Sequence, residues 1–350
     1  MSQLVVITAG PATSIQDAGR FGAQRYGLTS SGAMDRVSLA VANTLAGNSA
    51  FAAAIEIGPL PASFTAHDGA IRIALSGAAR TADIAGTPLS LNETALVAEG
   101  ETLKLGPARN GMFGYLAIEG GVKGAPVFGS LSVNARAGLG SPFPRPLQAG
   151  DKLDVGTAKL AAHERALDIH EWPKSPIRVV MGPQDDEFGA ACETFLNSEW
   201  RVSATSDRMG YRLEGERIVH SGGHNIVSDG AVRGSIQVPG NGQPIVLMAD
   251  HGTTGGYPKI ATVISADLGR FAQMQAGSAI RFKAISVEDA QTEARRLMEF
   301  LQALPAQVHT AGGSSLNLLE LQQANVAGAA VNAVDTVTWQ TQIVGEPQSK

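Results

Sequence analysis

Hydrophobic residues in this chain fall mostly into short runs in which apolar and polar positions alternate, and this pattern predicts β-strands. Residues 71–75, IRIAL, are followed by a glycine turn, and residues 115–118, YLAI, end at Gly120-Gly121. A second series of such runs begins at Ile177. Further strands are expected at residues 4–8, 153–155, 234–238, 245–249 and 279–284. Short strands and tight turns therefore account for most of the chain.

Three segments instead favour helices. In the first, residues 34–45, Asp35 lies near the start, where a carboxylate can accept hydrogen bonds from free backbone N–H groups. Gly47 is expected to end this helix. The other two cover residues 185–197 and 287–301. After Pro305 the composition changes; residues 316–333 are either a helix or a floppy terminus, and residues 346–350 are expected to be disordered.

Two pairs of segments indicate an internal repeat. IRIALSG at 71–77 resembles IRVVMG at 177–182, and LQAG at 147–150 resembles MQAG at 274–277. Matches this short also arise by chance, so duplication and coincidence both stay open. A duplication would give two related β-barrels at about 55–160 and 175–286, joined by a polar linker near residues 156–175.

Composition excludes several classes of protein. The 41 glycines and 17 prolines among 350 residues suit strands and turns better than helical bundles. A net charge of -5 argues against nucleic-acid binding, which needs a basic surface. The single cysteine, Cys192, excludes a disulfide within the chain. Neither a signal peptide nor an apolar run of membrane-spanning length is recognised, so a cytoplasmic protein is expected.

Three segments carry a resemblance to a known family. They are IQDAGRFG at 15–22, continued by GAMD at 32–35 and ANTLAGN at 42–48; SDRMGYRL at 206–213; and the stretch from GSIQVP to TTGGYPK at 234–259. In this order they resemble the second-subunit family of allophanate hydrolase type. That family includes the C subunit of bacterial 5-oxoprolinase, the kinase-inhibitor antagonist KipA and the carboxyltransferase region of urea carboxylase. The resemblance extends over residues 4–286.

The resemblance implies a mainly β, cyclophilin-like β-barrel fold with a few helices, with room for two related barrels. Residues 1–286 would form the region like allophanate hydrolase subunit 2, with subdomains at about 1–160 and 175–286. Residues 287–350 would form a C-terminal helix and tail, in which residues 319–333 are similar to the family's usual C-terminal segment.

The resemblance also implies that the chain functions as one subunit of a multi-subunit enzyme. The leading expectation is ATP-dependent opening of 5-oxoproline, a cyclic amide, to glutamate, with ATP bound at the level of the complex. The expected partners are a KipI-like first-subunit protein, which is the B component of 5-oxoprolinase, and an A component of LamB/YcsF type. Two alternatives stay open. One is a carboxyltransferase-like subunit that moves a carboxyl group to urea or a related amide from carboxybiotin on a separate carrier. The other is a non-catalytic KipA-like binder of the first-subunit protein.

The glycine-rich stretch at residues 234–259 is the first candidate site. Its glycines let backbone N–H groups approach a phosphate, a carboxylate or a developing oxyanion. On the local sequence alone a tight hairpin is the better explanation, and the resemblance reverses this preference. The catalytic candidates are Asp250, Thr253, Thr254 and Tyr257, and the substrate-binding candidates in the stretch are Gln237, Gly255, Gly256 and Lys259. The Gln237 amide suits a lactam or urea-like group, although an ordinary strand-end amide stays equally open.

Asp17 and Arg20, three residues apart in a glycine-rich loop, complete the substrate-binding candidates. The guanidinium fork of arginine binds both oxygens of a carboxylate such as that of 5-oxoproline. A structural ion pair between Asp17 and Arg20 is an equal alternative. For the charged residues of segment 206–213, the apolar side chains beside them favour a structural role.

No metal site is predicted. His220 and His224 are spaced loosely like a ligand pair, but no cysteine or third histidine supports them. His251, next to Asp250, is a weaker candidate for a general base. The chain lacks a Gly-Lys-Ser/Thr phosphate loop, a Gly-x-Ser-x-Gly elbow, a dinucleotide-binding glycine motif and a biotin-attachment context.

The chain also departs from the family pattern at two places that bear on its substrate. Leu131 and Val133 stand where the family usually has arginine and a Ser-Thr pair. His251 and Gly252 stand where it usually has arginine and a polar residue.

Overall fold

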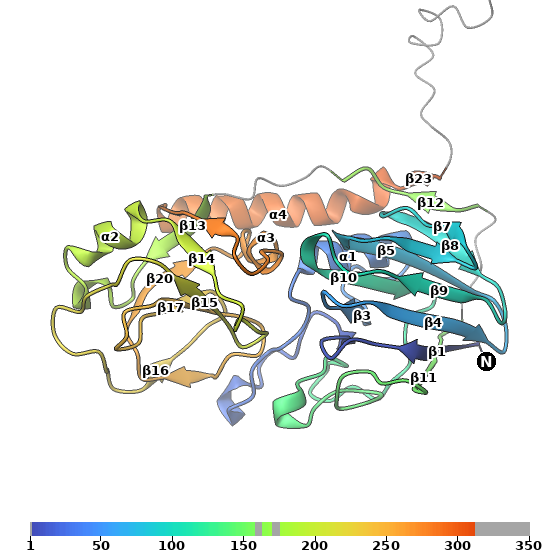
Figure 1. Cartoon of the computed structure of the whole chain (residues 1–350), viewed down its shortest axis with the longest axis horizontal. Coiled ribbons are helices and arrows are strands. Elements are labelled where there is room, and N and C mark those ends of the chain that lie inside the picture. The colour runs from blue at the N-terminus through green and yellow to red at the C-terminus, as the bar shows by residue number, and fades with distance from the viewer. Residues whose placement is uncertain (1, 158–162, 170–175, 312–350) are drawn as a thin grey trace, which may run out of the picture. The chain divides into compact units, whose positions relative to one another are not determined.

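The computed structural model describes residues 2–157, 163–169 and 176–311, and within them the chain is mainly β (Figure 1). The fold class expected from the turn-rich sequence is therefore confirmed, and the helix considered at residues 316–333 lies outside the described residues. Two sets of strands follow one another along the chain, and four α-helices are added to them within the described part.

The first set of strands forms two sheets packed face to face. One has the order β11 (Lys152–Asp154), β1 (Gln3–Thr8), β4 (Ala62–His67), β9 (Thr102–Leu105), β6 (Ala82–Ile84) and β7 (Thr87–Pro88). The other has the order β2 (Ser14–Gln16), β3 (Ala54–Ile57), β10 (Asn110–Ile118), β5 (Ile71–Ala79), β8 (Glu93–Val97), β12 (Arg165–Ala166) and β23 (His309–Thr310). Leu4, Phe64, Ile73 and Leu116 are buried in the core that the two sheets share. The strand alternation seen in the sequence thus supplies one apolar face to each sheet.

The second set forms one eight-stranded sheet. Its order is β21 (Ala279–Ile280), β14 (Trp200–Val202), β15 (Gly210–Glu214), β18 (Ile245–Leu247), β17 (Ser235–Gln237), β20 (Lys259–Val263), β13 (Ile177–Met181) and β22 (Phe282–Ala284). All neighbours are antiparallel except β13 and β22, which run parallel. A separate pair of short strands joins β16 (Asp229–Gly230) to β19 (Thr254–Gly255), and β19 lies in the glycine-rich stretch.

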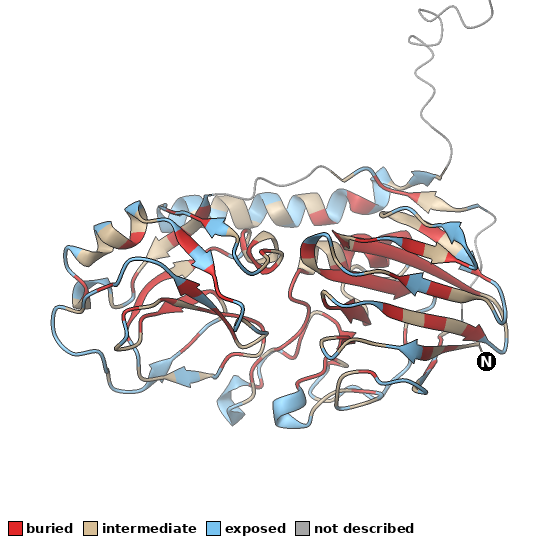
Figure 2. Ribbon diagram, in the orientation of Figure 1, coloured by how far each residue is buried: buried red, intermediate tan, exposed pale blue. Residues whose placement is uncertain are grey.

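The helices are α1 (Arg36–Leu45), α2 (Ala191–Asn197), α3 (Leu268–Ala272) and α4 (Val287–Gln307), and short 3-10 turns lie at Gln24–Tyr26, Ala135–Ala137 and Asp185–Glu187. Helix α1 packs on β5 and β10 of the first set and also contacts α3 and α4. Figure 2 shows its buried residues in red beside the largely exposed surface of α4. Because α1 contributes to the same buried cluster as Trp200 and Phe271, it joins the core of the second sheet to the first set of strands.

Most expected elements are present, with two changes of boundary. Asp35 caps α1 as predicted, since its carboxylate accepts hydrogen bonds from the backbone N–H groups of Val37 and Ser38. The helix expected over residues 185–197 starts only at Ala191, after a 3-10 turn and Gly189 in a left-handed conformation. Helix α4 runs beyond residue 301 to Gln307, with Pro305 in its last turn. Proline lacks a backbone N–H group, so one helical hydrogen bond is lost. The loss is tolerated at this end of the helix, where the last backbone carbonyls have no helical partners in any case.

Candidate functional site

Asp17 fixes the glycine-rich loop that follows β2. Its carboxylate accepts hydrogen bonds from the backbone N–H groups of Gly19 (2.8 Å) and Leu131 (2.7 Å), and from the hydroxyls of Ser130 (2.7 Å) and Ser132. Apart from the Gly19 N–H, these donors come from one short segment opposite the loop. The departure from the family pattern at Leu131 therefore leaves this contact intact, because Leu131 supplies only its main chain.

Arg20 lies behind this carboxylate and is fully buried. One terminal nitrogen, Nη2, donates to the carbonyl of Ser132, while Nε and Nη1 have no hydrogen-bond partner among the described residues. Burial lowers the pKa of Arg20, and the nearby negative charges of Asp17 and Asp250 oppose that effect. No ion pair joins Asp17 to Arg20 within the described chain, so the structural pair weighed from the sequence is not formed. A buried guanidinium with two unused N–H donors remains.

Asp250 is held by a second arginine. The Nε and Nη2 groups of Arg208 donate to the two oxygens of Asp250 at 2.8 and 3.1 Å, a bidentate contact. Nη1 of Arg208 donates to the fully buried Glu56, and Nη2 also donates to the carbonyl of Gly32 at 2.8 Å. Burial disfavours the charge, but the carboxylates of Asp250 and Glu56 outweigh it and raise the pKa of Arg208. Arg208 is thus a permanent cation that positions Asp250.

Glu56 continues this network into the first set of strands. Its second oxygen accepts from the hydroxyl of Tyr115 and from the backbone N–H of Met34, both at 2.7 Å. The Tyr115 hydroxyl in turn accepts from the backbone N–H of Asp35 at 2.7 Å. Burial, with the charges of Glu56 and Asp35, raises the pKa of Tyr115, so the phenol stays protonated. One chain of hydrogen bonds therefore runs from the start of α1 to Asp250.

Two further contacts hold the loop before α1 against the second sheet. Arg233 donates to the carbonyls of Ala33 (3.0 Å) and Met34 (2.6 Å), and burial lowers its pKa to about 10. The Thr29 hydroxyl donates to the carbonyl of Ala249 at 3.0 Å. Through these bonds the loop carrying Arg20 lies beside the segment carrying Asp250.

His251 follows Asp250 and is 4% exposed. Its Nδ1 lies 2.6 Å from the carbonyl oxygen of Gly252, which can only accept, so Nδ1 carries the proton. Burial and the nearby Arg233 lower the pKa of His251. The ring is then neutral near pH 7, and its Nε2 atom has a lone pair without a hydrogen-bond partner in the described chain.

The glycine-rich stretch does not form the tight hairpin considered from the sequence, because β19 pairs with β16, and β17 and β18 lie between these two strands along the chain. Strand β19 pairs Gly255 with Asp229, and the backbone N–H of Ala231 donates to the Thr253 carbonyl. A Cβ atom at Gly255 would overlap Nε2 of Gln237, so only glycine allows this approach. Gln237 is buried, and its side-chain amide makes no hydrogen bond to a described residue. The side-chain amide of Gln237 therefore lies directly against the backbone of Gly255.

The remaining candidates lie in β19 or between β19 and the start of β20. Lys259 is buried, and its ammonium group donates to the carboxylate of Asp229 at 2.8 Å. Tyr257 is 40% exposed, and Thr254 lies on the surface. The backbone N–H of Ile226 donates to the carbonyl of Gly256 at 2.8 Å. Lys259 therefore has a partner of its own, whereas Gln237 and Arg20 keep unused donors.

Sequence reasoning missed Glu56 and Tyr115. Glu56 is the one acidic residue in the apolar strand β3, Ala54–Ile57, and such a charge inside a buried strand was the available signal. Tyr115 gave no comparable signal, because aromatic residues are common in strands. Its role depends on Asp35, 80 positions away in the sequence.

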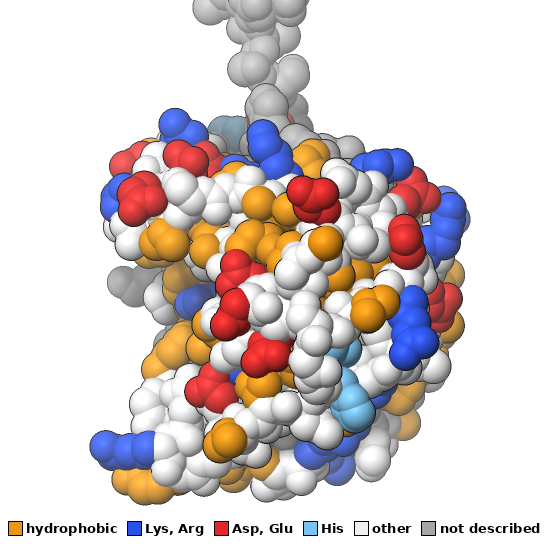
Figure 3. Space-filling model, turned by 90° about the vertical axis from the view of Figure 1, so that its left-hand side faces the viewer, with side chains coloured by type: hydrophobic (Ala, Val, Ile, Leu, Met, Phe, Trp, Pro, Cys, Tyr) orange, Lys and Arg blue, Asp and Glu red, His pale blue; other side chains and the backbone are white. Residues whose placement is uncertain are grey.

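Other site types find little support in the part of the chain that the structure describes. No group of three or more His, Cys, Asp or Glu residues could hold a metal ion there, although the rings of His220 and His224 lie 6.3 Å apart. None of the described helices is long and apolar enough to cross a membrane. On the end formed by the second sheet, Figure 3 shows acidic and basic side chains interspersed among hydrophobic ones.

Comparisons with known proteins agree with this architecture. Residues 26–284 match the family model described as carboxyltransferase domain, subdomain A and B. The chain is 38% identical to the C subunit of 5-oxoprolinase from Escherichia coli over 311 residues, which cover 87% of this chain and 99% of that protein. It is 37% identical to the Haemophilus influenzae protein of the same name, over 79% of this chain and 89% of the relative.

A solved structure shows the same fold. The crystal structure of Kluyveromyces lactis urea carboxylase superposes with a TM-score of 0.79 at 28% identity, over 86% of this chain and 29% of that chain. This chain thus corresponds to one part of that larger protein. The family match and the two bacterial relatives extend over both sets of strands, and the resemblance noted in the sequence is confirmed: the chain belongs to the carboxyltransferase-domain family that includes the C subunit of 5-oxoprolinase.

Proposed function

We propose that this chain is the C subunit of an ATP-dependent 5-oxoprolinase, and that it helps to open 5-oxoproline to glutamate. Two relatives of that name match nearly their whole length. The structural observation that carries the proposal is Arg20, whose buried guanidinium keeps two N–H groups without partners. A carboxylate such as that of 5-oxoproline would supply an acceptor to Nε or to Nη1, which point to different sides of the guanidinium.

Access to Arg20 requires the loop around it to open, because the guanidinium is sealed from solvent. The loop is built for close approach: a Cβ atom at Gly19 would lie 2.7 Å from the carbonyl oxygen of Ser30, and one at Gly32 would lie 2.8 Å from the Gly19 nitrogen. Both glycines have positive φ. Glycine also gives this loop the backbone freedom to change conformation. We propose that the substrate enters by displacing this loop.

The lactam group of the substrate is assigned to the second half of the site. The amide of Gln237 can donate to the lactam carbonyl and accept from its N–H, and backbone N–H groups of Gly255 and Gly256 are candidates to stabilise charge that develops on the oxygen. His251 offers Nε2 as a general base. Asp250, with both oxygens on Arg208, then acts as a positioning residue.

A lactam is a stable amide, and ATP supplies the activation by phosphorylating its carbonyl oxygen. The chain has no Gly-Lys-Ser/Thr phosphate loop. ATP is therefore assigned to the complex with the KipI-like first-subunit protein and the LamB/YcsF-type protein, acting in the cytoplasm.

The direct test is a reconstituted assay. The purified chain, mixed with the two partner proteins, is expected to release glutamate and ADP from 5-oxoproline, and to release neither alone. Arg20→Met is expected to raise KM by about tenfold or more, since one charged hydrogen-bonding contact contributes about 1.5–3 kcal/mol. Arg25→Met, an exposed arginine in the same loop whose guanidinium lies over Tyr26, is the matched control and should leave KM unchanged.

Two results would overturn the proposal. The complete mixture could form no glutamate, or the two arginine variants could behave alike. Asp250→Asn tests the positioning role in the same assay: the rate should fall while the KM for 5-oxoproline changes little. An unchanged rate would remove Asp250 from the site.

A second function is favoured by the family model and by the urea carboxylase structure: transfer of a carboxyl group from carboxybiotin to urea or a related amide. The sequence has no biotin-attachment context, so the biotin would arrive on a separate carrier. In that case avidin would abolish turnover in a mixture that contains a biotinylated carrier. A non-catalytic binder of the first-subunit protein would instead be captured by that protein without any turnover.

A further inference from the structure

Exposed aromatic rings gather on two loops of the first set of strands. Four phenylalanine and tyrosine side chains are exposed within the described chain, and three of them are Phe21 (62%), Tyr26 (60%) and Phe128 (52%). The ring centres of Tyr26 and Phe128 lie 6.0 Å apart. The loop with the 3-10 turn Gln24–Tyr26 projects, in blue, at the lower edge of Figure 1. Exposed aromatic residues grouped in this way are typical of a protein–protein interface.

Phe128 lies at the tip of a tight turn in a strained conformation. The backbone groups of Val127 and Ser130 pair across the turn, and φ is 51° at Phe128 and 75° at Gly129. Two positive φ values are those of a type I′ turn, whose first central residue is usually asparagine, aspartate or glycine. A large side chain is disfavoured in this left-handed region. Because the Phe128 ring is also largely exposed, its strain points to a function outside the folded core.

Hydrogen bonds fasten the two loops together. Asp17, which precedes the first loop, accepts from the hydroxyls of Ser130 (2.7 Å) and Ser132 in the second. Nδ2 of Asn134 donates to the hydroxyl of Ser31 at 3.1 Å. The aromatic rings are therefore presented together on one surface.

Arg36 adds a cation beside these rings. The central carbon of its guanidinium lies 5.6 Å from the ring centre of Phe21 and 4.8 Å from that of Phe51. Its Nε atom is buried without a hydrogen-bond partner in the described chain, whereas its two terminal nitrogens reach solvent. Burial lowers the pKa of Arg36, and no acidic group in the described chain opposes that effect.

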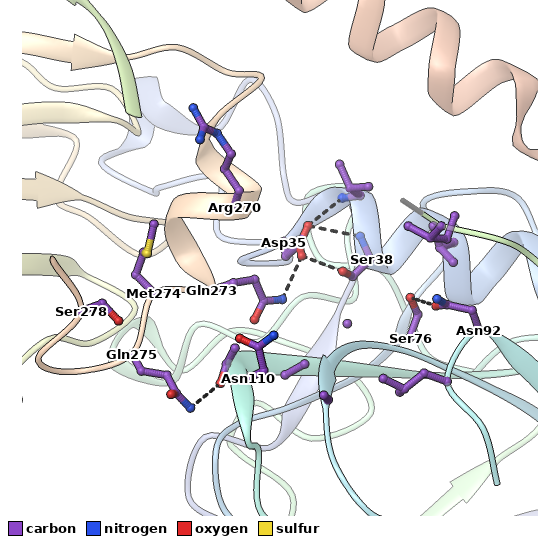
Figure 4. A pocket seen from close by; sticks show the side chains of 18 of the residues that line it. Asp35, Ser38, Ser76, Asn92, Asn110, Arg270, Gln273, Met274, Gln275 and Ser278 are labelled. Atoms are coloured by element: carbon purple, nitrogen blue, oxygen red, sulfur yellow. Dashed lines mark hydrogen bonds between the residues drawn. The ribbon is translucent and has the colours of Figure 1, made fainter. Parts of the chain in front are cut away.

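The neighbouring acid, Asp35, is already engaged elsewhere. Its carboxylate accepts from the backbone N–H of Ser38 at 3.2 Å, from the Ser38 hydroxyl at 2.6 Å and from Nε2 of Gln273 at 2.8 Å (Figure 4). Arg36 therefore has no counter-charge among the described residues.

A second arginine shows what Arg36 lacks. Arg145 lies over the ring of Phe143 at 4.8 Å, and its terminal nitrogens donate to the two oxygens of Asp151 at 2.7 and 2.8 Å. The corresponding side of Arg36 faces solvent. Residues 18–34 and 120–150, which include both loops, contain no aspartate or glutamate, although the whole chain has a net charge of -5. The complement of Arg36 is thus a carboxylate from outside the chain.

We propose that Phe21, Tyr26, Phe128 and Arg36 form a docking surface for a partner protein that presents an aspartate or glutamate side chain within an apolar patch. The carboxylate accepts from the terminal nitrogens of Arg36, and the apolar patch packs on the three rings. The occupant is the first-subunit protein. This choice rests on the proposed function, and that protein is also the partner of the non-catalytic binder considered there.

The test is binding of the full-length chain to the immobilised first-subunit protein, measured by biolayer interferometry. Phe128→Asn should raise Kd about tenfold because the ring is lost, while the unfolding midpoint stays the same or rises because asparagine suits the turn. Arg36→Met should also raise Kd about tenfold and make binding less sensitive to salt, since one charge pair is removed. The matched controls are Leu96→Ser in β8 and Arg296→Met in α4, two exposed residues whose replacement should leave Kd unchanged.

Three results would overturn the docking surface. The two proteins could fail to associate, or Phe128→Asn and Arg36→Met could bind as tightly as the controls. The chain alone could also sediment as a dimer that Arg36→Met dissociates, because a second copy would then cover the surface. Glutamate release separates these results from the proposed function: if both variants weaken binding but the unmodified complex forms no glutamate, the surface is supported and the 5-oxoprolinase activity is refuted.

Discussion

Replacing Tyr115 with phenylalanine tests the hydrogen-bond chain that joins α1 to Asp250. The hydroxyl is completely buried, donates to Glu56 and accepts from the backbone N–H of Asp35, each at 2.7 Å. Phenylalanine fills the same space, so no large cavity forms. The change therefore removes two hydrogen bonds and leaves the partners of both without water to replace them.

The size of the effect follows from these two partners. An orphaned buried N–H costs about 1–3 kcal/mol, and loss of a hydrogen bond to a charged carboxylate costs about 1.5–3 kcal/mol. Glu56 keeps its bonds to Met34 and Arg208, which limits the second loss. The free energy of unfolding should thus fall by about 3 kcal/mol.

Urea unfolding, followed by fluorescence and circular dichroism, measures this loss. Tyr211→Phe is the matched control, because Tyr211 is also buried but donates a single hydrogen bond, at 2.7 Å, to the carbonyl of Ala272. It should cost about 1 kcal/mol. If Tyr115→Phe costs no more than Tyr211→Phe, the Tyr115 hydroxyl does not hold the network together and the reasoning is refuted.

Three other substitutions test separate parts of the structure. Gly255→Ala should leave the unfolding midpoint nearly unchanged but raise KM in the reconstituted assay, because its Cβ atom displaces the Gln237 amide; Gly223→Ala, with open space around it, is the control. Burial lowers the pKa of His251 below its ordinary 6.5. The neutral imidazole therefore contributes to the free energy of unfolding above pH 6.5, and this contribution is lost as the pH falls through the folded-state pKa. His251→Gln should flatten the dependence of the unfolding free energy on pH in that window. Asp267→Asn removes the buried charge that pairs with two arginines and should lower the free energy of unfolding by about 3 kcal/mol, measured in urea, whereas an effect below about 1 kcal/mol would show that the pairs contribute little.

Local patterns were sufficient for much of the fold. Alternation of apolar residues located β5 and β10, and Asp35 located the start of α1, because each depends on neighbours within a few positions. The order of the strands within each sheet could not be predicted from the sequence. Strand β23 (His309–Thr310), near the far end of the described chain, pairs with β12 of the first set. The spacing of apolar residues within a strand does not indicate which distant strand it will pair with.

The candidate site, like the fold, could be predicted from the sequence only in part. Motifs pointed to Asp17, Arg20 and Gln237, and the structure holds the loop that carries Arg20 against the segment that carries Asp250, through the hydrogen bond from Thr29 to the Ala249 carbonyl. The sequence could not show that Asp17 and Arg20 avoid pairing with each other. That outcome depends on donors at residues 130–132, which lie over 110 positions further along the chain.

Asp250 shows most clearly what a sequence leaves undecided. An acid beside glycines and threonines is a natural candidate for a base, and nothing in its neighbouring sequence contradicts that role. Arg208, 42 positions earlier, occupies both of its oxygens and holds Glu56 as well. Because both oxygens of Asp250 are engaged, we propose that proton transfer at this site falls to His251, whose Nε2 makes no hydrogen bond in the described chain. A mutation of Asp250 then reports on the geometry of the site, and a mutation of His251 reports on its chemistry.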